Sequence, residues 1–186
     1  MSERLKDKVA LITGGAQGLG KEMAKSMLAE SAHVIIADIN EDKLVEAAKE
    51  LSCSHLILDV TKEEQWQSVI KQITDDTGSL NILVNNAGIG GGGDVEMTDS
   101  ETWDLVHRVN LDSVFLGCKY ALPLMRESGN GSIINISSMS GIVASHNTAA
   151  YNSSKAAVRH LSKSVALHCA KSTNLVRCNS IHPVFT

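Results

Sequence analysis

The sequence contains no long apolar run and no surplus of basic residues. Its 186 residues include 17 Lys and Arg against 21 Asp and Glu, for a net charge of -4. Because no basic cluster is present to follow a phosphate backbone, we expect no nucleic-acid partner. No segment approaches the roughly 20 apolar residues that a membrane span needs, and the opening MSERLKDKVA lacks the apolar stretch of a signal peptide. We therefore expect a cytoplasmic protein with no membrane contact.

Cysteine and histidine are too scattered to indicate a disulfide framework or a metal site. Cys53, Cys118, Cys169 and Cys178 lie far apart without CxxC spacing, so we expect reduced, packed side chains. The seven histidines form no ligand pattern. We expect His107, His160 and His168 on helix surfaces or packed against neighbours, and we predict no bound metal.

Proline is scarce as well, and no linker, repeat or charge block divides the chain. Only two prolines are present, and the glycine-rich stretch GIGGGGD (88–94) is too short to join domains. We expect it to be a flexible loop. An apolar content of 43% is enough for one sizeable core. The sequence therefore predicts a single domain over residues 1–186.

Short apolar runs rich in Val and Ile alternate with segments of helical periodicity. The runs are KVALIT (8–13), HVIIAD (33–38), HLILDV (55–60), NILVNNAG (81–88), SIINISS (132–138) and VRCNSIH (176–182). The intervening apolar stripes include Leu19, Met23, Met27 and Leu28, then Leu44, Ala48 and Leu51, then Trp66, Val69, Ile70 and Ile73. This alternation predicts an α/β fold in three layers, with a doubly wound parallel sheet of Rossmann type.

A glycine-rich turn follows the first predicted strand. In TGGAQGLG, Gly14, Gly18 and Gly20 precede the first predicted helix. Glycine permits a tight turn and close approach of a ligand, so the pyrophosphate of a dinucleotide can lie against the helix N-terminus. The spacing is GxxxGxG rather than GxGxxG, and such turns also occur for purely structural reasons.

The second predicted strand ends in Asp38, where a carboxylate can bind the ribose hydroxyls of an adenosine and repel a 2′-phosphate. Ala16 and Gln17 in the glycine loop offer no cation for such a phosphate. We therefore expect NAD as the cofactor rather than NADP. The alternative is that Asp38 only caps the next helix.

Tyr151 and Lys155 lie four residues apart in a predicted helix, on one face. A phenol with an ordinary pKa of about 10 is a poor base at neutral pH, and a neighbouring ammonium favours its ionised form. Ser138 closes a predicted strand at the edge of the sheet where ligands bind. The three residues suggest acid/base chemistry on a substrate oxygen, although a Tyr and a Lys at this spacing also arise by chance.

Four motifs taken together resemble the short-chain dehydrogenase/reductase family. These are TGGAQGLG, NNAG, ISS and YNSSK, in this order, and the match extends from about residue 6 to the end. The resemblance implies that Tyr151 is the acid/base, that Lys155 lowers its pKa and binds the nicotinamide ribose, and that Ser138 orients the substrate oxygen. Asn110 would hold a water in a proton relay from Lys155, unless it is an ordinary mid-helix amide.

The resemblance also implies further contacts to the cofactor. Asp59 and Val60 would contact the adenine, although Asp59 is equally explained as a cap at the end of a strand. Asn86, Ala87 and Gly88 would line the adenosine side, and the backbone N–H of Leu19 would bind the pyrophosphate. The loop residue Gln17 would also bind the cofactor. Pro183 and Thr186 would lie beside the nicotinamide, with Thr186 near its carboxamide.

Two features depart from the family pattern. Val184 follows Pro183 where family members commonly have glycine, and its Cβ would crowd the nicotinamide. The family continues past Thr186 through another strand and the helices that cover the substrate, so we expect either a fragment or a missing remainder. Predicted helices 102–126 and 150–171 match those that form the family's dimer and tetramer interfaces, which implies a homo-oligomer.

The segments NLVRCNSIHP and SIINISS are similar to the bacterial 3β/17β-hydroxysteroid dehydrogenase branch and to secondary-alcohol dehydrogenases. The leading hypothesis is an NAD-dependent oxidoreductase that moves a hydride between a secondary alcohol and nicotinamide. A 3-oxoacyl thioester reductase is a rival, although that chemistry usually consumes NADPH. A dinucleotide-binding module without turnover is the alternative outside the enzyme class.

Overall fold

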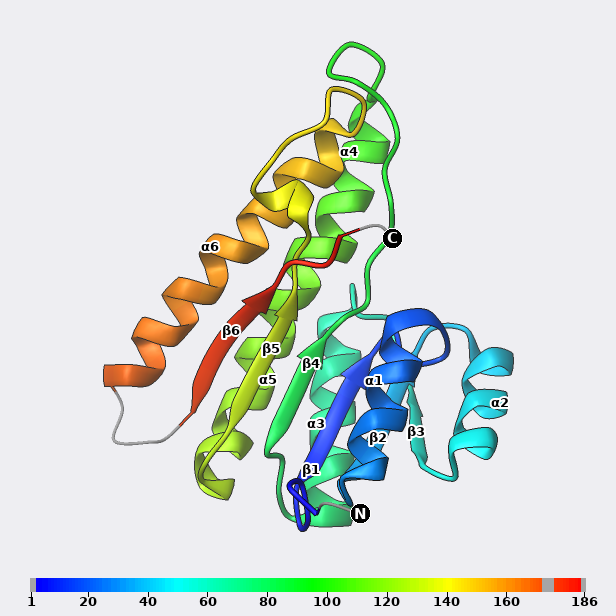
Figure 1. The fold of residues 1–186 in the computed structure, drawn as a ribbon, viewed down its shortest axis with the longest axis vertical. Coiled ribbons are helices and arrows are strands. Elements are labelled where there is room, and N and C mark those ends of the chain that lie inside the picture. Colours follow the sequence, from blue (N-terminus) through cyan, green and yellow to red (C-terminus); the bar gives the residue numbers. More distant parts are fainter. Residues whose placement is uncertain (1–2, 172–175, 185–186) are drawn as a thin grey trace.

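The protein, described here by a computed structural model for residues 3–171 and 176–184, is built on a six-stranded parallel sheet. The strands are β1 (Val9–Thr13), β2 (His33–Asp38), β3 (Ser54–Ile57), β4 (Ile82–Asn85), β5 (Ser132–Ile136) and β6 (Arg177–Ile181). Their order is β3-β2-β1-β4-β5-β6, with β3 and β6 at the two edges (Figure 1). The predicted doubly wound α/β fold is confirmed.

Helices lie between the strands and cover both faces of the sheet (Figure 1). They are α1 (Gly18–Ala29), α2 (Glu41–Leu51), α3 (Glu63–Thr77), α4 (Ser100–His107), α5 (Ser113–Ser128) and α6 (Ala149–Lys171). A π-helical segment, η1 (Arg108–Asp112), joins α4 to α5, and a 3₁₀ turn, η2 (Met139–Gly141), follows β5. Among the described residues, no helix combines the length and the apolar character needed to cross a bilayer.

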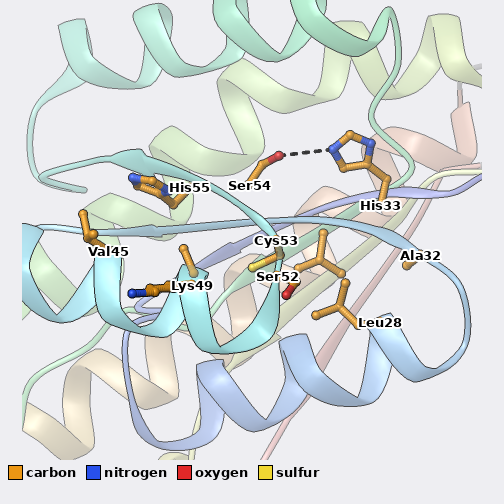
Figure 2. Close-up of a pocket in the computed structure, with 11 residues that line it drawn as sticks. Leu28, Ala32, His33, Val45, Lys49, Ser52, Cys53, Ser54 and His55 are labelled. Carbon is orange, nitrogen blue, oxygen red and sulfur yellow. Dashed lines mark hydrogen bonds between the residues drawn. The ribbon is translucent and has the colours of Figure 1, made fainter.

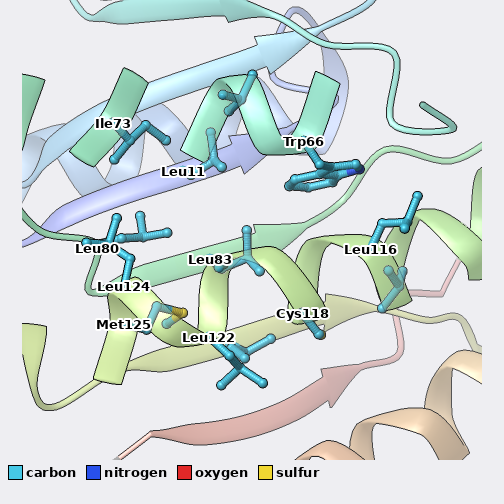
Figure 3. Close-up of a cluster of buried hydrophobic side chains, with 14 of the residues drawn as sticks. Leu11, Trp66, Ile73, Leu80, Leu83, Leu116, Cys118, Leu122, Leu124 and Met125 are labelled. Carbon is cyan, nitrogen blue, oxygen red and sulfur yellow. The ribbon is translucent and has the colours of Figure 1, made fainter. Parts of the chain in front are cut away.

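Alternate residues of β1 belong to two separate apolar clusters, one on each face of the sheet. Ala10 and Ile12 pack in the cluster that contains Ala24 of α1 and Leu44 of α2. Leu11 packs in the other cluster, which lies between the sheet and helices α3 and α5 (Figure 3). Because both faces of the strands are covered, their sequences are continuous apolar runs rather than alternating ones.

The predicted strands are in the right places, but several predicted ranges extend past the carboxyl end of the observed strand. The largest differences are 55–60 against Ser54–Ile57, 81–88 against Ile82–Asn85, 132–138 against Ser132–Ile136 and 176–182 against Arg177–Ile181. Beyond these ends the backbone leaves the regular ladder. The N–H groups of Asn86 and Ala87, for example, donate to the Thr13 side chain. Apolar residues continue past the ladder, so composition alone does not mark its end.

The single helix predicted over 102–126 is wrong, because the chain forms three consecutive segments there. Helix α4 ends at His107, η1 follows, and α5 begins at Ser113. A π-helical segment places one extra residue in a turn and is frequent at functional sites. Asn110 lies inside η1 and is completely buried.

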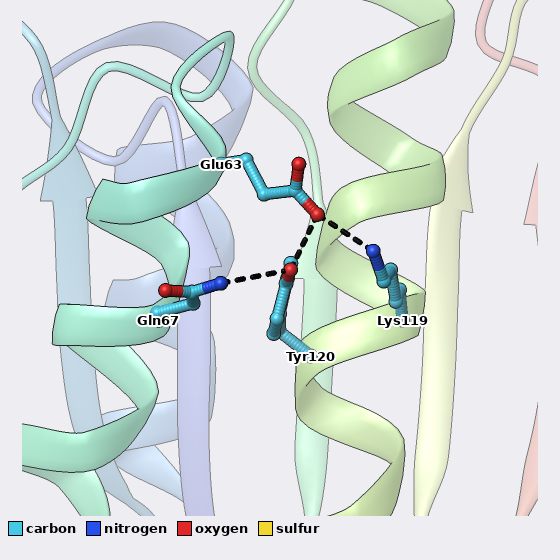
Figure 4. Close-up of polar contacts among 4 residues, drawn as sticks. All are labelled: Glu63, Gln67, Lys119 and Tyr120. Atoms are coloured by element: carbon cyan, nitrogen blue, oxygen red, sulfur yellow. Dashed lines mark hydrogen bonds and ion pairs between the residues drawn. The ribbon is translucent and has the colours of Figure 1, made fainter.

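Polar side chains join α3 to α5 on the outer surface of the helical layer (Figure 4). Glu63 accepts hydrogen bonds from Tyr120 and from Lys119, the latter at 2.6 Å, and Gln67 donates to the Tyr120 hydroxyl at 3.0 Å. The bonds from Lys119 and Tyr120 lower the pKa of the Glu63 carboxyl. Exposed pairs of this kind add little stability. The buried apolar side chains of α3 and α5 therefore stabilise the packing of the two helices more than these polar contacts do.

Candidate active site

The glycine turn between β1 and α1 depends on glycine at positions that include Gly14, Gly18 and Gly20. Gly14 and Gly18 have positive φ angles of 64° and 56°, which disfavour other residues. A Cβ on Gly20 would lie 2.1 Å from the carbonyl oxygen of Gly14. The first turn of α1 therefore packs directly on the loop backbone, and its N-terminus is exposed to a ligand.

A cavity of about 680 Å³ opens over this turn, at the carboxyl ends of β1, β2 and β4. Ten residues that the sequence assigned to cofactor binding line it: Gly14, Gln17, Gly18, Leu19, Asp38, Asp59, Val60, Asn86, Ala87 and Gly88. Gly20 lies behind the turn and does not line it. The N-cap residue of α1, Gln17, makes no side-chain cap bond to the helix. Open helix N–H groups beside glycines that admit close approach fit the pyrophosphate of a dinucleotide.

Asp38 lines this cavity and does not cap α2. Its two oxygens accept hydrogen bonds from the backbone N–H groups of Ala16 at 3.2 Å and Asn40 at 3.0 Å. Asn40 is the N-cap, because its side chain accepts from the N–H of Lys43 at 3.1 Å. The alternative that Asp38 only caps the helix is therefore wrong.

The glycine loop itself offers no cation, but a cation from another segment contacts Gln17, which lines the cavity. The Lys43 ammonium, from the first turn of α2, donates to the Gln17 side chain at 2.9 Å. The sequence argument considered only loop residues, and Lys43 is brought there by the fold. The cavity therefore has a carboxylate in its lining and an ammonium bonded to one of its lining residues.

Two of the predicted cofactor residues have clear structural roles. Asp59 accepts hydrogen bonds from the N–H and the hydroxyl of Thr61, at 2.9 and 2.7 Å, so it caps the turn after β3 while also lining the cavity. Asn86 donates to the carbonyl oxygens of Thr13 and Gly14 at 2.9 and 3.1 Å. The NNAG motif thereby fixes the glycine turn against β4.

A second cavity, of about 710 Å³, adjoins the first and contains Tyr151 and Lys155. The two cavities share Leu19, Asn86 and Gly88 among their lining residues. Leu19 was expected on the buried stripe of α1, but it is 57% exposed and faces these cavities. The dinucleotide cleft and the Tyr151 cavity therefore form one continuous site.

Lys155 is held inside this site by α6. Its side chain is buried, and the ammonium donates to the carbonyl oxygen of Ile136 at 2.9 Å. The Lys155 Nζ atom lies 5.7 Å from the centre of the Tyr151 ring, on the same helix face. Burial lowers the pKa of Lys155 from 10.5 to about 8. The ammonium still predominates at neutral pH, beside the phenol.

Asn110 anchors the loop that follows β4. Its side chain accepts from the Ile89 N–H at 2.8 Å and donates to the Ile89 carbonyl at 2.9 Å. The same amide donates to the Ser154 hydroxyl at 3.2 Å. A Cβ on Gly88 would lie 3.1 Å from the Asn110 oxygen and 3.3 Å from the Lys155 nitrogen, so Asn110 and Lys155 meet at Gly88.

Ser138 lies just behind the wall of the cavity. It is 4% exposed, and its hydroxyl accepts from the N–H of Ser140 at 3.1 Å. Ser140, Ser145 and Thr148, which the sequence did not single out, line the cavity with Tyr151. They come from the irregular segment after β5, where no periodic pattern marks a functional residue.

The family model described as short chain dehydrogenase matches residues 8–186 of the chain. The chain belongs to the short-chain dehydrogenase family. It is an oxidoreductase that acts on CH–OH groups with a nicotinamide dinucleotide.

Curated relatives and solved structures place this short-chain dehydrogenase among enzymes of alcohols and hydroxysteroids. It is 43% identical over 185 residues to a 3-beta-hydroxysteroid dehydrogenase of Comamonas testosteroni, covering 98% of this chain and 72% of that protein. It is 40% identical to an NADP-dependent (R)-specific alcohol dehydrogenase of Lentilactobacillus kefiri, covering 98% and 75%. A short chain dehydrogenase from Mycobacterium smegmatis has a TM-score of 0.92 at 34% identity, with 97% of this chain and 78% of that chain covered.

The sequence assigned Pro183 and Thr186 of this short-chain dehydrogenase to the nicotinamide end of the site. The carbonyl oxygen of Pro183 accepts from the N–H of Met139 at 3.1 Å, so Pro183 runs beside the catalytic segment without lining either cavity. Val184 is exposed. Thr186 lies outside the described residues.

A third cavity, of about 520 Å³, lies at the amino-terminal ends of β2 and β3, whereas the first cavity lies at the carboxyl ends of the strands (Figure 2). Its floor includes Leu28 and Val45, and the His33 ring lies 3.5 Å from the Ser54 hydroxyl on its wall. The half-buried thiol of Cys53 also faces it, and burial raises the pKa of that thiol. This cavity takes no part in the cofactor cleft.

Proposed function

We propose that this short-chain dehydrogenase transfers a hydride between a secondary alcohol and NAD, with Tyr151 as the acid/base. The observation that carries the proposal is the position of Tyr151 and Lys155 in a cavity continuous with the dinucleotide cleft. Any alcohol carbon bound against Tyr151 would then lie beside the nicotinamide end of the cleft.

The chain's own residues would handle the proton of the reaction. Bound oxidised nicotinamide supplies the hydride acceptor for the alcohol carbon. Tyr151 would take the hydroxyl proton as the ketone forms, and Ser138 would orient the substrate oxygen. The Lys155 ammonium would stabilise the phenolate, and unit charges about 6 Å apart attract by about 3 kcal/mol at an effective dielectric near 20. Asn110 would support the relay that returns the proton to solvent.

The preference for NAD rests on the position of Asp38. Its carboxylate is fixed by two backbone N–H groups at the adenosine end, where a 2′-phosphate would meet its negative charge. Lys43 acts in the opposite direction, and one relative is named as NADP-dependent. We propose that Asp38 prevails, because a 2′-phosphate would have to displace the carboxylate from its hydrogen bonds.

The proposed substrate is a hydroxysteroid or a small secondary alcohol. The cavity beside Tyr151 has apolar walls from Ile89 and Ile136, and the glycines Gly90, Gly91 and Gly92 leave one side free of side chains. Such a wall suits a bulky apolar skeleton. Reduction of a 3-oxoacyl thioester remains the rival reaction, and binding of a dinucleotide without turnover is the alternative outside catalysis.

We also propose a cytoplasmic single-domain subunit that assembles into a homodimer or homotetramer. Helices α5 and α6 expose large apolar side chains, including Phe115 at 50% and Leu167 at 68%. Exposed apolar residues on neighbouring helices favour association.

The test of the catalytic proposal compares the full-length protein with its Tyr151→Phe variant. Initial rates of NAD reduction are measured with small secondary alcohols and with 3β- and 17β-hydroxysteroids, and NADP serves as the comparison cofactor. We expect turnover with NAD to fall by about 10³-fold or more in the variant, because only the acid/base hydroxyl is lost. NADH binding, followed by fluorescence, should stay close to that of the wild type. Retained turnover in the variant would contradict the assignment of Tyr151.

A further inference from the structure

His182 places its imidazole ring against the backbone of Ser138. The residue follows β6 directly, and its side chain is half-buried. Its Nδ1 atom lies 3.1 Å from the carbonyl oxygen of Ser138. Its Nε2 atom lies 3.0 Å from the hydroxyl of Ser180. The ring therefore connects the end of β6 with the residue expected to orient the substrate oxygen.

The two partners determine which ring nitrogen carries the proton. A carbonyl oxygen only accepts, so Nδ1 must be the donor to Ser138. In the neutral ring Nε2 then accepts the Ser180 hydroxyl proton. Ser180 can also accept if the ring becomes doubly protonated, so the bond to Ser138 survives in both charge states.

The segment that contains His182 runs beside Ser138. The segment after β6 continues alongside β5, with the Ser137 N–H donating to Ile181 at 2.8 Å and the Met139 N–H donating to Pro183 at 3.1 Å. The Ser138 carbonyl also accepts from the N–H of Gly141 at 2.9 Å, within the η2 turn. The His182 imidazole therefore adds a second donor to this carbonyl, from a segment distant in the sequence.

We propose that His182 is a positioning residue for Ser138, which it orients through the Nδ1–H bond to the Ser138 carbonyl. The inference rests on the proposed function, in which the Ser138 hydroxyl holds the substrate oxygen. Ser138 has an extended backbone, with φ -163° and ψ 161°, and its hydroxyl already meets the Ser140 N–H. Without the His182 bond, the Ser138 carbonyl would be held only by the Gly141 N–H of the short η2 turn, and a shift of this peptide would move the hydroxyl relative to Tyr151.

The test compares two variants that differ in whether a donor remains at the Nδ1 position. His182→Asn places an amide N–H close to Nδ1, whereas His182→Leu fills a similar space without a donor. A displacement of about 1 Å in a positioned group lowers rates by up to about 10²-fold. We expect kcat to fall by about 10-fold to 100-fold in His182→Leu and to recover to within about 3-fold of the wild type in His182→Asn. NADH affinity should stay unchanged in both.

Ser180→Ala is the matched control, because it removes the partner of Nε2 and leaves the bond to Ser138. We expect kcat within about 3-fold of the wild type for this variant. Equal losses in His182→Leu and His182→Asn would show that only packing matters, and full activity in His182→Leu would show that the bond has no effect. Either result would overturn the inference.

Failure of this inference is distinguishable from failure of the proposed function. Tyr151→Phe, measured in the same assay, reports on the proposed function alone. The ¹⁵N chemical shifts of the His182 ring report on the inference without any turnover, since we expect the neutral Nδ1–H tautomer. A neutral Nε2–H tautomer would overturn the inference even if Tyr151→Phe is inactive.

Discussion

Asp38 and Lys43 bring opposite charges to the end of the cleft where we propose that the adenosine binds. The carboxylate is tied to two backbone N–H groups, and the ammonium contacts the neighbouring Gln17 side chain. A cofactor with a 2′-phosphate would be repelled by the first and attracted by the second. If the adenosine binds as proposed, the choice between NAD and NADP would depend on a balance between these two residues rather than on one.

Replacing Asp38 by Ser should shift this balance toward NADP. The substitution removes the repulsive charge, keeps a small polar side chain and leaves the Lys43 ammonium in place. Because a unit charge a few ångströms away contributes several kcal/mol at an effective dielectric near 20, we expect kcat/KM for NADP to rise by at least about 10-fold. The measurement is the ratio of kcat/KM with NADP to that with NAD.

The double variant Asp38→Ser, Lys43→Gln is the control for this effect. Without the ammonium, most of the gain with NADP should disappear. An equal gain in the single and double variants would show that Lys43 does not face the phosphate. A strong preference of the wild type for NADP would contradict the proposed role of Asp38 at once.

At single residues, the sequence identified groups whose chemistry is visible in their type together with their spacing on a helix or their place at the end of a strand. Tyr151, Lys155 and Asp38 are of this kind, and the structure puts them in one continuous site. Lys43 and His182 were missed. Their partners lie at residues 17 and 138, so their positions depend on how distant segments pack.

At the scale of elements, periodicity predicted the strand and helix order because both faces of the sheet are buried. It did not predict η1, because a π-helical segment uses the same residue types as an α-helix. Here the added residue accompanies a buried amide, Asn110, that bonds to Ile89 and to Ser154. Contacts with other segments, rather than local propensity, specify this segment.

The contact between η2 and α6 predicts a destabilising substitution at Gly141. A Cβ there would lie 2.7 Å from the Lys155 carbonyl oxygen and 2.8 Å from the Ser137 hydroxyl. Because a backbone atom is in the way, Gly141→Ala should lower the free energy of unfolding by about 1–3 kcal/mol. Urea denaturation measures this change. Lys155 would shift with its carbonyl, so turnover should fall as well.

Gly92→Ala is the matched control for Gly141→Ala. A Cβ on Gly92 meets no heavy atom within 4 Å, so its unfolding free energy should stay within about 1 kcal/mol of the wild type. Equal stability of the two variants would show that η2 and α6 are not packed as closely as described.

For the whole molecule, the buried ammonium of Lys155 lowers the stability of the fold. The carboxyl ends of the strands gather the cofactor residues, and α6 adds Tyr151 and Lys155 from the other side. Lys155 is buried in this site, and burial lowers its pKa to about 8. The folded protein therefore holds a charge that the unfolded chain would keep in water.

This cost predicts that stability rises with pH between about 8 and 10.5. Below about pH 8, Lys155 is protonated in both states, and the folded protein carries the full desolvation cost. Between the two pKa values the unfolded chain binds the proton and the folded protein does not, so stability increases with pH. Above 10.5 both states are neutral and the gain is complete. A lowering from 10.5 to about 8 corresponds to about 3 kcal/mol.

The measurement is the free energy of unfolding of the cofactor-free protein at several pH values, compared with Lys155→Met. The variant is needed because burial also raises the pKa of the Cys169 thiol, which makes stability fall as pH rises. That contribution is common to both proteins and cancels in the difference. We expect Lys155→Met to be the more stable of the two near pH 7, with the difference shrinking toward pH 10.5. A difference that does not vary with pH would show that Lys155 titrates normally in the folded protein, and the buried ammonium would then cost the fold nothing.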